Sequence, residues 1–79
     1  MSDIILFSQP DCPPCEITKK FFKEYGISFI EKNIKVDQKA RNVLINKYQS
    51  YSTPTIVIGD QVIRGFDANE LMKALNIQE

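Results

Sequence analysis

The first part of the chain shows the apolar pattern of a buried strand followed by an amphipathic helix. Residues 4–7 (Ile-Ile-Leu-Phe) form a continuous apolar run, which is typical of a strand that is buried on both faces. Farther along, Ile17, Phe21 and Tyr25 recur at a four-residue spacing and predict the apolar face of a helix. Gly26 is a suitable stop for this helix, because glycine accepts the left-handed conformation found at helix ends.

The middle of the chain predicts three further strands and a second helix. Residues 27 to about 34 predict a strand whose polar character favours the edge of a sheet. Residues 55–58 and 61–64 are strand-like and flank a Gly-Asp pair, which suits the tight turn of a hairpin. Asp37 is a good N-cap for the helix between them, whose face would carry Ala40, Val43, Leu44 and Lys47.

The C-terminal helix has the clearest start signals. Asp67 is a good N-cap, and Glu70 three residues later completes a capping-box-like pair. Phe66 and Leu71 occupy the two positions of a hydrophobic staple across this helix start. The buried stripe of the helix would comprise Leu71, Met72 and Leu75.

These elements predict an α/β fold in the order strand, helix, strand, helix, strand, strand, helix. The 79 residues can build one hydrophobic core but not two. No linker, repeat or low-complexity segment interrupts the order, so we expect a single domain over residues 1–79.

Composition and charge argue against several classes of protein. Ten basic residues balance ten acidic ones, so the net charge gives no reason to expect nucleic acid or an anionic membrane as a partner. No apolar run approaches the roughly 20 residues that span a bilayer. Residues 1–4 lack the basic and apolar pattern of a signal peptide, so we expect a cytoplasmic location. We also expect the protein to be a monomer.

Cys12 and Cys15 are the only cysteines, and they are separated by two prolines. Two thiols at this spacing at a helix start share one face of the helix. The positive end of the helix favours a thiolate at Cys12, and a second thiol behind it is what thiol–disulfide exchange requires. The same spacing also occurs as half of a zinc site, whereas a lone structural disulfide is not expected in a reducing compartment.

The absence of histidine narrows these alternatives. It excludes Cys–His nucleophilic catalysis and every imidazole metal ligand. A tetrahedral zinc site would need carboxylates or a second chain to complete Cys12 and Cys15, so we expect no metal site. The residues therefore favour a redox centre.

The prolines between the cysteines shape the chemistry expected of Cys12. We expect Cys12 to be the exposed nucleophile and Cys15, one turn into the helix, to be partly covered. Pro14 has no N–H, so only the N–H of Cys15 can donate to a Cys12 thiolate, and Asp11 adds a like charge. We therefore predict a Cys12 pKa below the free value of about 8.5 but above the extreme of about 3.5.

The expected reaction is dithiol–disulfide exchange. The Cys12 thiolate attacks a substrate disulfide, and Cys15 then attacks the mixed disulfide and releases the reduced substrate. The protein is left with an intramolecular disulfide that another thiol must reduce. Protein disulfides and glutathione disulfide are both chemically suitable substrates.

The C-x-x-C pair after the first strand, together with Thr53-Pro54 before the hairpin, resembles the thioredoxin fold at its minimal size. Within that superfamily the chain is most similar to glutaredoxins and glutaredoxin-like NrdH redoxins. The resemblance implies a four-stranded mixed sheet with helices on both faces, the first two strands being parallel. It also implies a cis Pro54 beside the cysteines, with the backbone of Thr53 free to pair with substrate. A trans proline at the first residue of a strand is the alternative.

The resemblance leaves the electron donor open between glutathione, as a cosubstrate and not a bound cofactor, and thioredoxin reductase. Glutaredoxins carry a lysine where this chain has Gln9, and the pair Gly65-Phe66 resembles NrdH redoxins, which thioredoxin reductase reduces. Asp67 matches the glutaredoxin residue that contacts the glutathione amino group, but it also suffices as a helix cap. The candidate substrate-binding residues are Gln9, Pro13, Pro14, Thr53, Arg64, Gly65, Phe66 and Asp67, beside Cys12, Cys15 and Pro54 as catalytic residues.

A non-enzymatic function is the competing class. Some glutaredoxins hold a [2Fe–2S] cluster between two monomers through the first cysteine and bound glutathione. The resemblance makes this function unfavourable here, because a proline follows Cys12 directly and Gln9 weakens glutathione capture.

Overall fold

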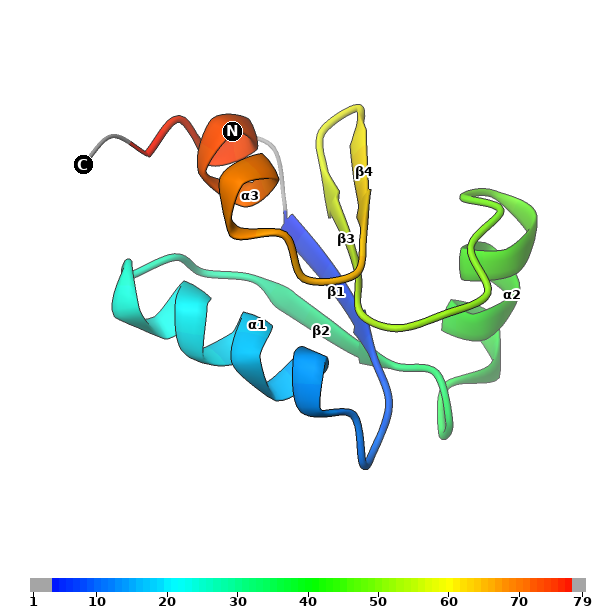
Figure 1. Ribbon diagram of the computed structural model, residues 1–79. Helices are drawn as coiled ribbons and strands as arrows, with labels where there is room; N and C mark the ends of the chain where they lie inside the picture. The colour runs from blue at the N-terminus through cyan, green and yellow to red at the C-terminus, as the bar shows by residue number, and fades with distance from the viewer. Residues whose placement is uncertain (1–3, 78–79) are drawn as a thin grey trace.

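The computed structural model describes residues 4–77, and its elements follow the predicted order (Figure 1). They are β1 (Ile4–Ser8), α1 (Pro13–Glu24), β2 (Ile30–Asn33), α2 (Gln38–Asn46), β3 (Thr55–Ile58), β4 (Gln61–Arg64) and α3 (Ala68–Leu75). The signal-peptide expectation rests mainly on residues 1–3, which lie outside the described part. Within the described part, every helix is too short or too polar to cross a membrane.

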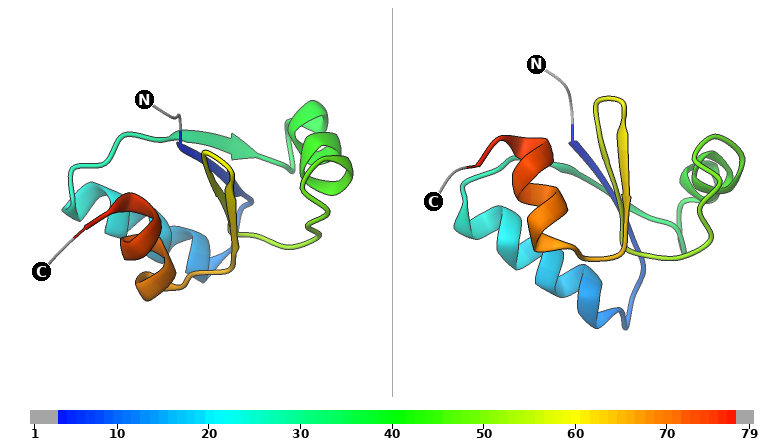
Figure 2. Two further views of the ribbon diagram at one scale, coloured as in Figure 1. Left: turned by 90° about the horizontal axis from the view of Figure 1, so that it is seen from above. Right: turned by 45° about the horizontal axis from the view of Figure 1, so that its top comes forward.

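The four strands form one mixed sheet in the order β2-β1-β3-β4. β1 pairs with β2 in parallel and with β3 in antiparallel, and β3 and β4 form the hairpin. Helices α1 and α3 lie on one face of this sheet and α2 lies on the other (Figure 2). The predicted mixed sheet with helices on both faces is therefore confirmed.

The central strand β1 contributes to a separate core on each face of the sheet, in place of the single core that we expected. Leu6 packs with Phe22 of α1 and Leu71 of α3, and its neighbour Phe7 packs with Leu44 of α2. Successive side chains of a strand point to opposite faces, so a strand covered on both sides must be apolar at adjacent positions. This explains the continuous apolar run at the start of the chain.

The buried face of α1 differs from the predicted one. Ile17 is 49% exposed and Tyr25 is 37% exposed, whereas Cys15, Thr18 and Phe22 are buried. The hydroxyl of Thr18 donates to the backbone carbonyl four residues earlier at 2.8 Å, so this polar side chain can be buried without losing a hydrogen bond. The spacing of apolar residues therefore predicted the wrong buried face for α1, because a threonine occupies one of the buried positions.

The second helix also buries less than the pattern indicated. Ala40 and Leu44 are buried, as predicted, because they lie four residues apart and face the sheet. Val43 is 40% exposed, and Lys47 is the C-cap residue of α2. The inner face of α2 is therefore a narrow one, in keeping with the smaller of the two cores.

The strand β2 is shorter than predicted, because Gly26 and Ile27, which precede it, take part in ending helix α1. Gly26 adopts a φ of +65°, and the N–H of Ile27 donates to the carbonyl of Phe22 at 2.8 Å. The helix therefore ends with Gly26 in the left-handed conformation directly after the C-cap residue Tyr25, as the position of the glycine predicted. The extended pairing with β1 starts only at Ile30.

The N-cap and the staple predicted at the start of α3 are present, but among residues 4–77 the Glu70 side chain makes no bond back to Asp67 to complete a capping box. The carboxylate of Asp67 accepts a hydrogen bond from the N–H of Glu70 at 3.1 Å, so Asp67 is the N-cap. Phe66 and Leu71 belong to the same apolar cluster, as a staple requires. The Glu70 carboxylate lies 4.0 Å from the ammonium group of Lys73 on the same helix.

The cap gives a stability prediction for Asp67. Replacing it in Asp67→Ala removes the bond to the first turn of α3 and should lower the free energy of unfolding by about 0.5–2 kcal/mol. Asp67→Asn keeps an equally good capping oxygen and should remain close to the unchanged protein. Urea denaturation of the two variants checks this, and an equal loss in both would contradict a capping role.

Candidate active site

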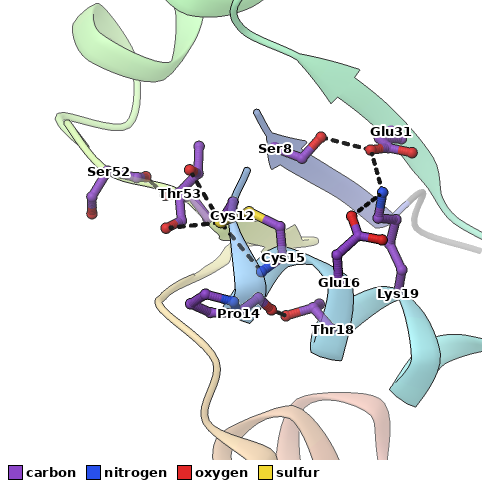
Figure 3. The surroundings of a disulfide bond; sticks show 11 residues. Ser8, Cys12, Pro14, Cys15, Glu16, Thr18, Lys19, Glu31, Ser52 and Thr53 are labelled. Atoms are coloured by element: carbon purple, nitrogen blue, oxygen red, sulfur yellow. Dashed lines mark hydrogen bonds and ion pairs between the residues drawn. A yellow bond between two sulfur atoms is a disulfide. The ribbon is translucent and has the colours of Figure 1, made fainter. Parts of the chain in front are cut away.

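Cys12 and Cys15 form a disulfide at the N-terminus of α1 (Figure 3). Cys12 is the N-cap residue, the two prolines occupy the first helical positions, and the two Cα atoms lie 5.2 Å apart. Cys15 is fully buried, and Cys12 is only 8% exposed. The expectation of an exposed Cys12 was therefore wrong for this disulfide form, because the sulfur is turned toward Cys15 and the loop before β3.

One side of Cys12 still borders the surface. Cys12 lines an open hollow together with Asp11, Pro13 and Glu16. Asp11 adopts a φ of +56°, a conformation that aspartate tolerates better than most residues. A substrate disulfide can approach the sulfur of Cys12 from this hollow, past two carboxylate side chains.

The sulfur of Cys12 has hydrogen-bond donors from two parts of the chain. Cys12 Sγ lies 3.3 Å from the backbone N of Cys15, the donor that the prolines left available. It also lies 3.6 Å from Thr53 Oγ1 and 3.7 Å from the Thr53 carbonyl oxygen. In the disulfide the sulfur can only accept. After reduction, a Cys12 thiol can donate to the carbonyl, and a thiolate can accept from the N–H and the hydroxyl.

The hydroxyl of Thr53 is a contact that sequence reasoning missed. Thr53 was expected to act through its backbone, and the hydroxyl lies 41 positions along the chain from Cys12. The bond to Pro54 is cis, as the resemblance implied, and Pro54 accepts a hydrogen bond from the N–H of Gly65 at 2.8 Å. Within residues 4–77 the N–H of Thr53 has no hydrogen-bond partner, so it can pair with an added strand.

A chain of hydroxyl groups holds the loop that carries Thr53. The hydroxyls of Ser50 and Thr55, both buried, lie 2.8 Å apart, and Thr55 Oγ1 lies 2.8 Å from the carbonyl oxygen of Ser52. A carbonyl only accepts, so the single hydroxyl hydrogen of Thr55 points to Ser52, and Ser50 must donate to Thr55. These bonds fix the residue that directly precedes Thr53.

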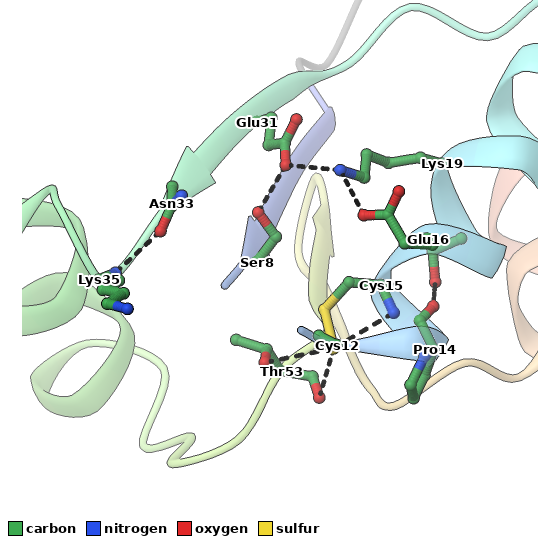
Figure 4. A network of polar contacts seen from close by, with 11 residues as sticks. Ser8, Cys12, Pro14, Cys15, Glu16, Lys19, Glu31, Asn33, Lys35 and Thr53 are labelled. Carbon is green, nitrogen blue, oxygen red and sulfur yellow. Dashed lines mark hydrogen bonds and ion pairs between the residues drawn. A yellow bond between two sulfur atoms is a disulfide. The ribbon is translucent and has the colours of Figure 1, made fainter. Parts of the chain in front are cut away.

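A second polar network lies at the end of β1, close to the cysteines (Figure 4). The buried hydroxyl of Ser8 donates to Glu31 at 2.7 Å, and Lys19 binds Glu31 at 3.2 Å and Glu16 at 2.7 Å. The hydrogen bond from Ser8, with help from Lys19, lowers the pKa of Glu31 against the opposing effect of burial. The hydrogen bond to Glu16 and the nearby Glu31 raise the pKa of Lys19. Glu16 therefore pairs with Lys19 across one helical turn.

Several candidate substrate-binding residues have structural partners of their own. The guanidinium group of Arg64 donates to the carbonyl of Tyr48 at 2.8 Å, and so joins β4 to the loop after α2. The ring of Phe66 packs edge-on against Phe21 of α1, with centroids 5.9 Å apart. Gly65 has a φ of +83°, and a Cβ there would meet nothing within 4 Å, so its backbone conformation explains the glycine.

Gln9 lies in a different cavity from the one beside Cys12. Two cations that the sequence reasoning did not single out, Lys35 and Arg41, share this cavity with Gln9, and its volume is about 330 Å³. The other lining residues are Ile34, Leu44, Ile45 and Tyr51. Two of its lining residues are close along the chain to the redox site, since Gln9 precedes Cys12 by three residues and Tyr51 precedes Thr53 by two. Among residues 4–77 no three Cys, Asp or Glu side chains are grouped as a metal site requires.

The hydroxyl chain gives a prediction for Thr55. Thr55→Val keeps the shape of the side chain but leaves the Ser52 carbonyl and the Ser50 hydroxyl unpartnered, which should cost about 1–3 kcal/mol of folding free energy. The loosened loop should also weaken the contact of Thr53 with Cys12 and so raise the pH midpoint of Cys12 alkylation in the reduced protein. Urea denaturation and the pH dependence of iodoacetamide alkylation measure both effects.

Thr55→Ser is the matched control, because it restores the hydroxyl without the methyl group. It should recover the alkylation midpoint of the unchanged protein. If Thr55→Val leaves that midpoint unmoved, the hydroxyl chain does not position Thr53.

Comparison with known proteins gives consistent results. A family model described as Glutaredoxin matches residues 4–63. An uncharacterized glutaredoxin-like 8.6 kDa protein in the rubredoxin operon of Clostridium pasteurianum is 32% identical over 72 residues, which cover 91% of this chain and 96% of that one.

Solved structures agree with this match. The crystal structure of a mutant of the thioredoxin-like protein BC3987 is 46% identical, with a TM-score of 0.93, and covers 99% of this chain and 100% of that one. The NrdH-redoxin from Escherichia coli has a TM-score of 0.78 at 22% identity, over 98% and 96% of the two chains, and shares the fold. Because the family model spans most of the chain, including the cysteine pair and Thr53-Pro54, this chain belongs to the glutaredoxin family.

Proposed function

We propose that the protein is a dithiol–disulfide oxidoreductase in which Cys12 is the nucleophile and Cys15 the resolving thiol. Membership of the glutaredoxin family supports a thiol–disulfide redox function in general. The observation that carries the specific assignment is the environment of the Cys12 sulfur, which has the Cys15 N–H at 3.3 Å and the Thr53 hydroxyl at 3.6 Å. Both donors stabilise a thiolate at Cys12, and among residues 4–77 the sulfur of the buried Cys15 has no hydrogen-bond donor of this kind.

The reaction passes two electrons in two exchange steps. The Cys12 thiolate attacks one sulfur of the substrate disulfide, forms a mixed disulfide and releases the other sulfur as a thiolate. Cys15 then loses its proton and attacks Cys12, which breaks the mixed disulfide and releases the second substrate thiolate. The substrate ends as two thiols and the protein as the Cys12–Cys15 disulfide, the form seen in the structure. The free N–H of Thr53 pairs with the substrate backbone during the first step.

A protein dithiol of the kind that thioredoxin reductase presents is the proposed electron donor. Arg64 and Asp67, two candidate glutathione contacts, already bind the Tyr48 carbonyl and the first turn of α3. Gln9 lacks the charge that would attract a carboxylate. Glutathione is the second candidate, because Asp67 matches the residue that contacts its amino group in glutaredoxins.

The order of the two cysteines can be tested by trapping the mixed disulfide. The reduced Cys15→Ser variant cannot resolve this intermediate, so incubation with oxidised glutathione should leave one glutathione bound to most of the protein. The Cys12→Ser variant should remain unmodified over the same time, because its remaining thiol is fully buried. Intact-mass spectrometry measures both, and an adduct that forms faster on Cys12→Ser would reverse the assignment of roles.

The donor can be tested by coupled consumption of NADPH with a protein disulfide as substrate. We expect turnover with thioredoxin reductase alone and little with glutathione plus glutathione reductase. The reverse result would identify glutathione as the donor while leaving the exchange chemistry intact. Visible absorbance of an iron–sulfur cluster after anaerobic purification would instead favour the carrier function.

A further inference from the structure

The open hollow beside Cys12 is lined by two carboxylate side chains. Asp11 directly precedes Cys12, and Glu16 follows it by one helical turn. The N–H of Glu16 donates to the carbonyl of Cys12 at 3.2 Å, which places the two residues one above the other at the start of α1. Side chains at this spacing have Cβ atoms about 5–6 Å apart. A charge on Glu16 is therefore close enough to act on a molecule that reacts with the Cys12 sulfur.

The two carboxylates of the hollow differ in their partners. Asp11 is exposed and has no ion pair among residues 4–77. Glu16 binds Lys19 at 2.7 Å, and Lys19 also binds Glu31 at 3.2 Å (Figure 3). Three carboxylates thus share one ammonium group, which leaves a formal charge of −2 on this side of the redox site.

Lys19 neutralises only part of the charge on Glu16, because it is shared with a second carboxylate. The hydroxyl of Ser8 donates to that carboxylate, Glu31, at 2.7 Å, so Glu31 is fixed against the sheet. The side chain of Glu16 is 63% exposed, whereas that of Lys19 is 30% exposed. The uncompensated part of the Glu16 charge therefore acts on the solvent in front of Cys12.

We propose that Asp11 and Glu16 make the redox site selective for disulfides that carry positive charge beside the reacting sulfurs, and that Lys19 limits the strength of this selectivity. This inference rests on the proposed function and names the class of substrate that it favours. A cationic group beside the substrate sulfur is attracted by the two carboxylates as Cys12 attacks, and an anionic group is repelled. Glutathione disulfide, whose two halves each carry a net negative charge, belongs to the disfavoured class.

The position of Glu16 also has a structural explanation. Glu16 lies in the first turn of α1, where the positive end of the helix favours a negative charge. This effect stabilises the helix whatever the charge of the substrate. A role in selectivity is therefore recognised by a change in the preference between substrates of opposite charge.

The test compares small symmetric disulfides of matched chain length: cystamine with two ammonium groups, dithiodipropionate with two carboxylates, and the neutral hydroxyethyl disulfide. Each is mixed in excess with the pre-reduced protein. Cys12 bonds to one substrate sulfur and releases the other as a thiol, and Cys15 then displaces the second thiol and leaves the Cys12–Cys15 disulfide. Excess N-ethylmaleimide stops the reaction, and intact-mass spectrometry measures the protein that is still reduced. Each rate constant is divided by that of dithiothreitol with the same disulfide, which removes the intrinsic reactivity of the disulfide.

We expect cystamine to react at least about threefold faster than dithiodipropionate at about 0.1 M salt, where the screening length is about 10 Å. Hydroxyethyl disulfide should lie between them. At about 1 M salt, where the screening length is about 3 Å, the normalised rates should converge. Glu16→Gln should lower the ratio of the cystamine rate to the dithiodipropionate rate about twofold. Lys19→Gln should raise it, because Glu16 then loses the ammonium group that partly neutralises it.

Lys23→Gln is the matched control for Lys19→Gln. It removes the same charge from the same helix, and Lys23 has no ion pair among residues 4–77. Lys23 lies eleven residues after Cys12, about 16 Å along the helix axis, so its charge is largely screened at about 0.1 M salt. The control should leave the ratio nearly unchanged. Because the same sulfur attacks both charged disulfides, the ratio also cancels any change in the reactivity of Cys12 itself.

Asp11→Asn gives a second measurement should Glu16→Gln be unstable, because asparagine accepts the left-handed backbone of Asp11, and it should lower the ratio as well. Equal normalised rates for the two charged disulfides, or equal ratios in Lys19→Gln and Lys23→Gln, would overturn the selectivity inference and leave the exchange function standing. A preference for dithiodipropionate, which the cations of the cavity around Gln9 would produce, would overturn it too. A reduced protein that reacts with none of the disulfides would instead refute the proposed function.

Discussion

The register between β1 and β3 is the constraint on which the site depends. Phe7 lies opposite Thr55, so the end of β1 and the start of β3 meet at the same edge of the sheet. The loop after β1 delivers Cys12, and the residues before β3 deliver Thr53 and Pro54. Because both strands are packed on two faces, a slip of one residue would exchange Leu6 and Phe7 between the two cores. Packing far from the cysteines therefore determines which backbone lies beside the reactive sulfur.

Features encoded by a few neighbouring residues were predictable from the sequence. The hairpin, the caps at Asp37 and Asp67 and the stop at Gly26 each depend on local backbone chemistry, and the structure contains all of them. The face of α1 was not predictable in this way. A threonine with its hydroxyl bonded to its own helix can occupy a core position, and an apolar side chain such as Ile17 can face solvent.

The parts of the site that could not be predicted from the sequence are those formed by residues distant from one another along the chain. The Thr53 hydroxyl reaches Cys12 only because the sheet brings two loops together. Lys35 and Arg41 meet Gln9 across a cavity formed by three separate segments. A net charge of zero indicated no electrostatic partner, yet half of the basic residues lie in the contiguous segment 32–47, in and around one short helix. This uneven distribution was visible in the sequence, because only the total over the whole chain is balanced.

The hydroxyl chain from Ser50 through Thr55 to the Ser52 carbonyl has a consequence for how this chemistry responds to acidity. None of its three groups gains or loses a proton in the range where proteins stay folded, and each of its hydrogens is already committed to one acceptor. The support of Thr53 is therefore indifferent to pH, whereas the sulfur beside it is not. The pH dependence of thiol–disulfide exchange in this protein therefore arises from the thiols themselves. The hydrogen bonds that hold Thr53 in place stay the same as the pH changes.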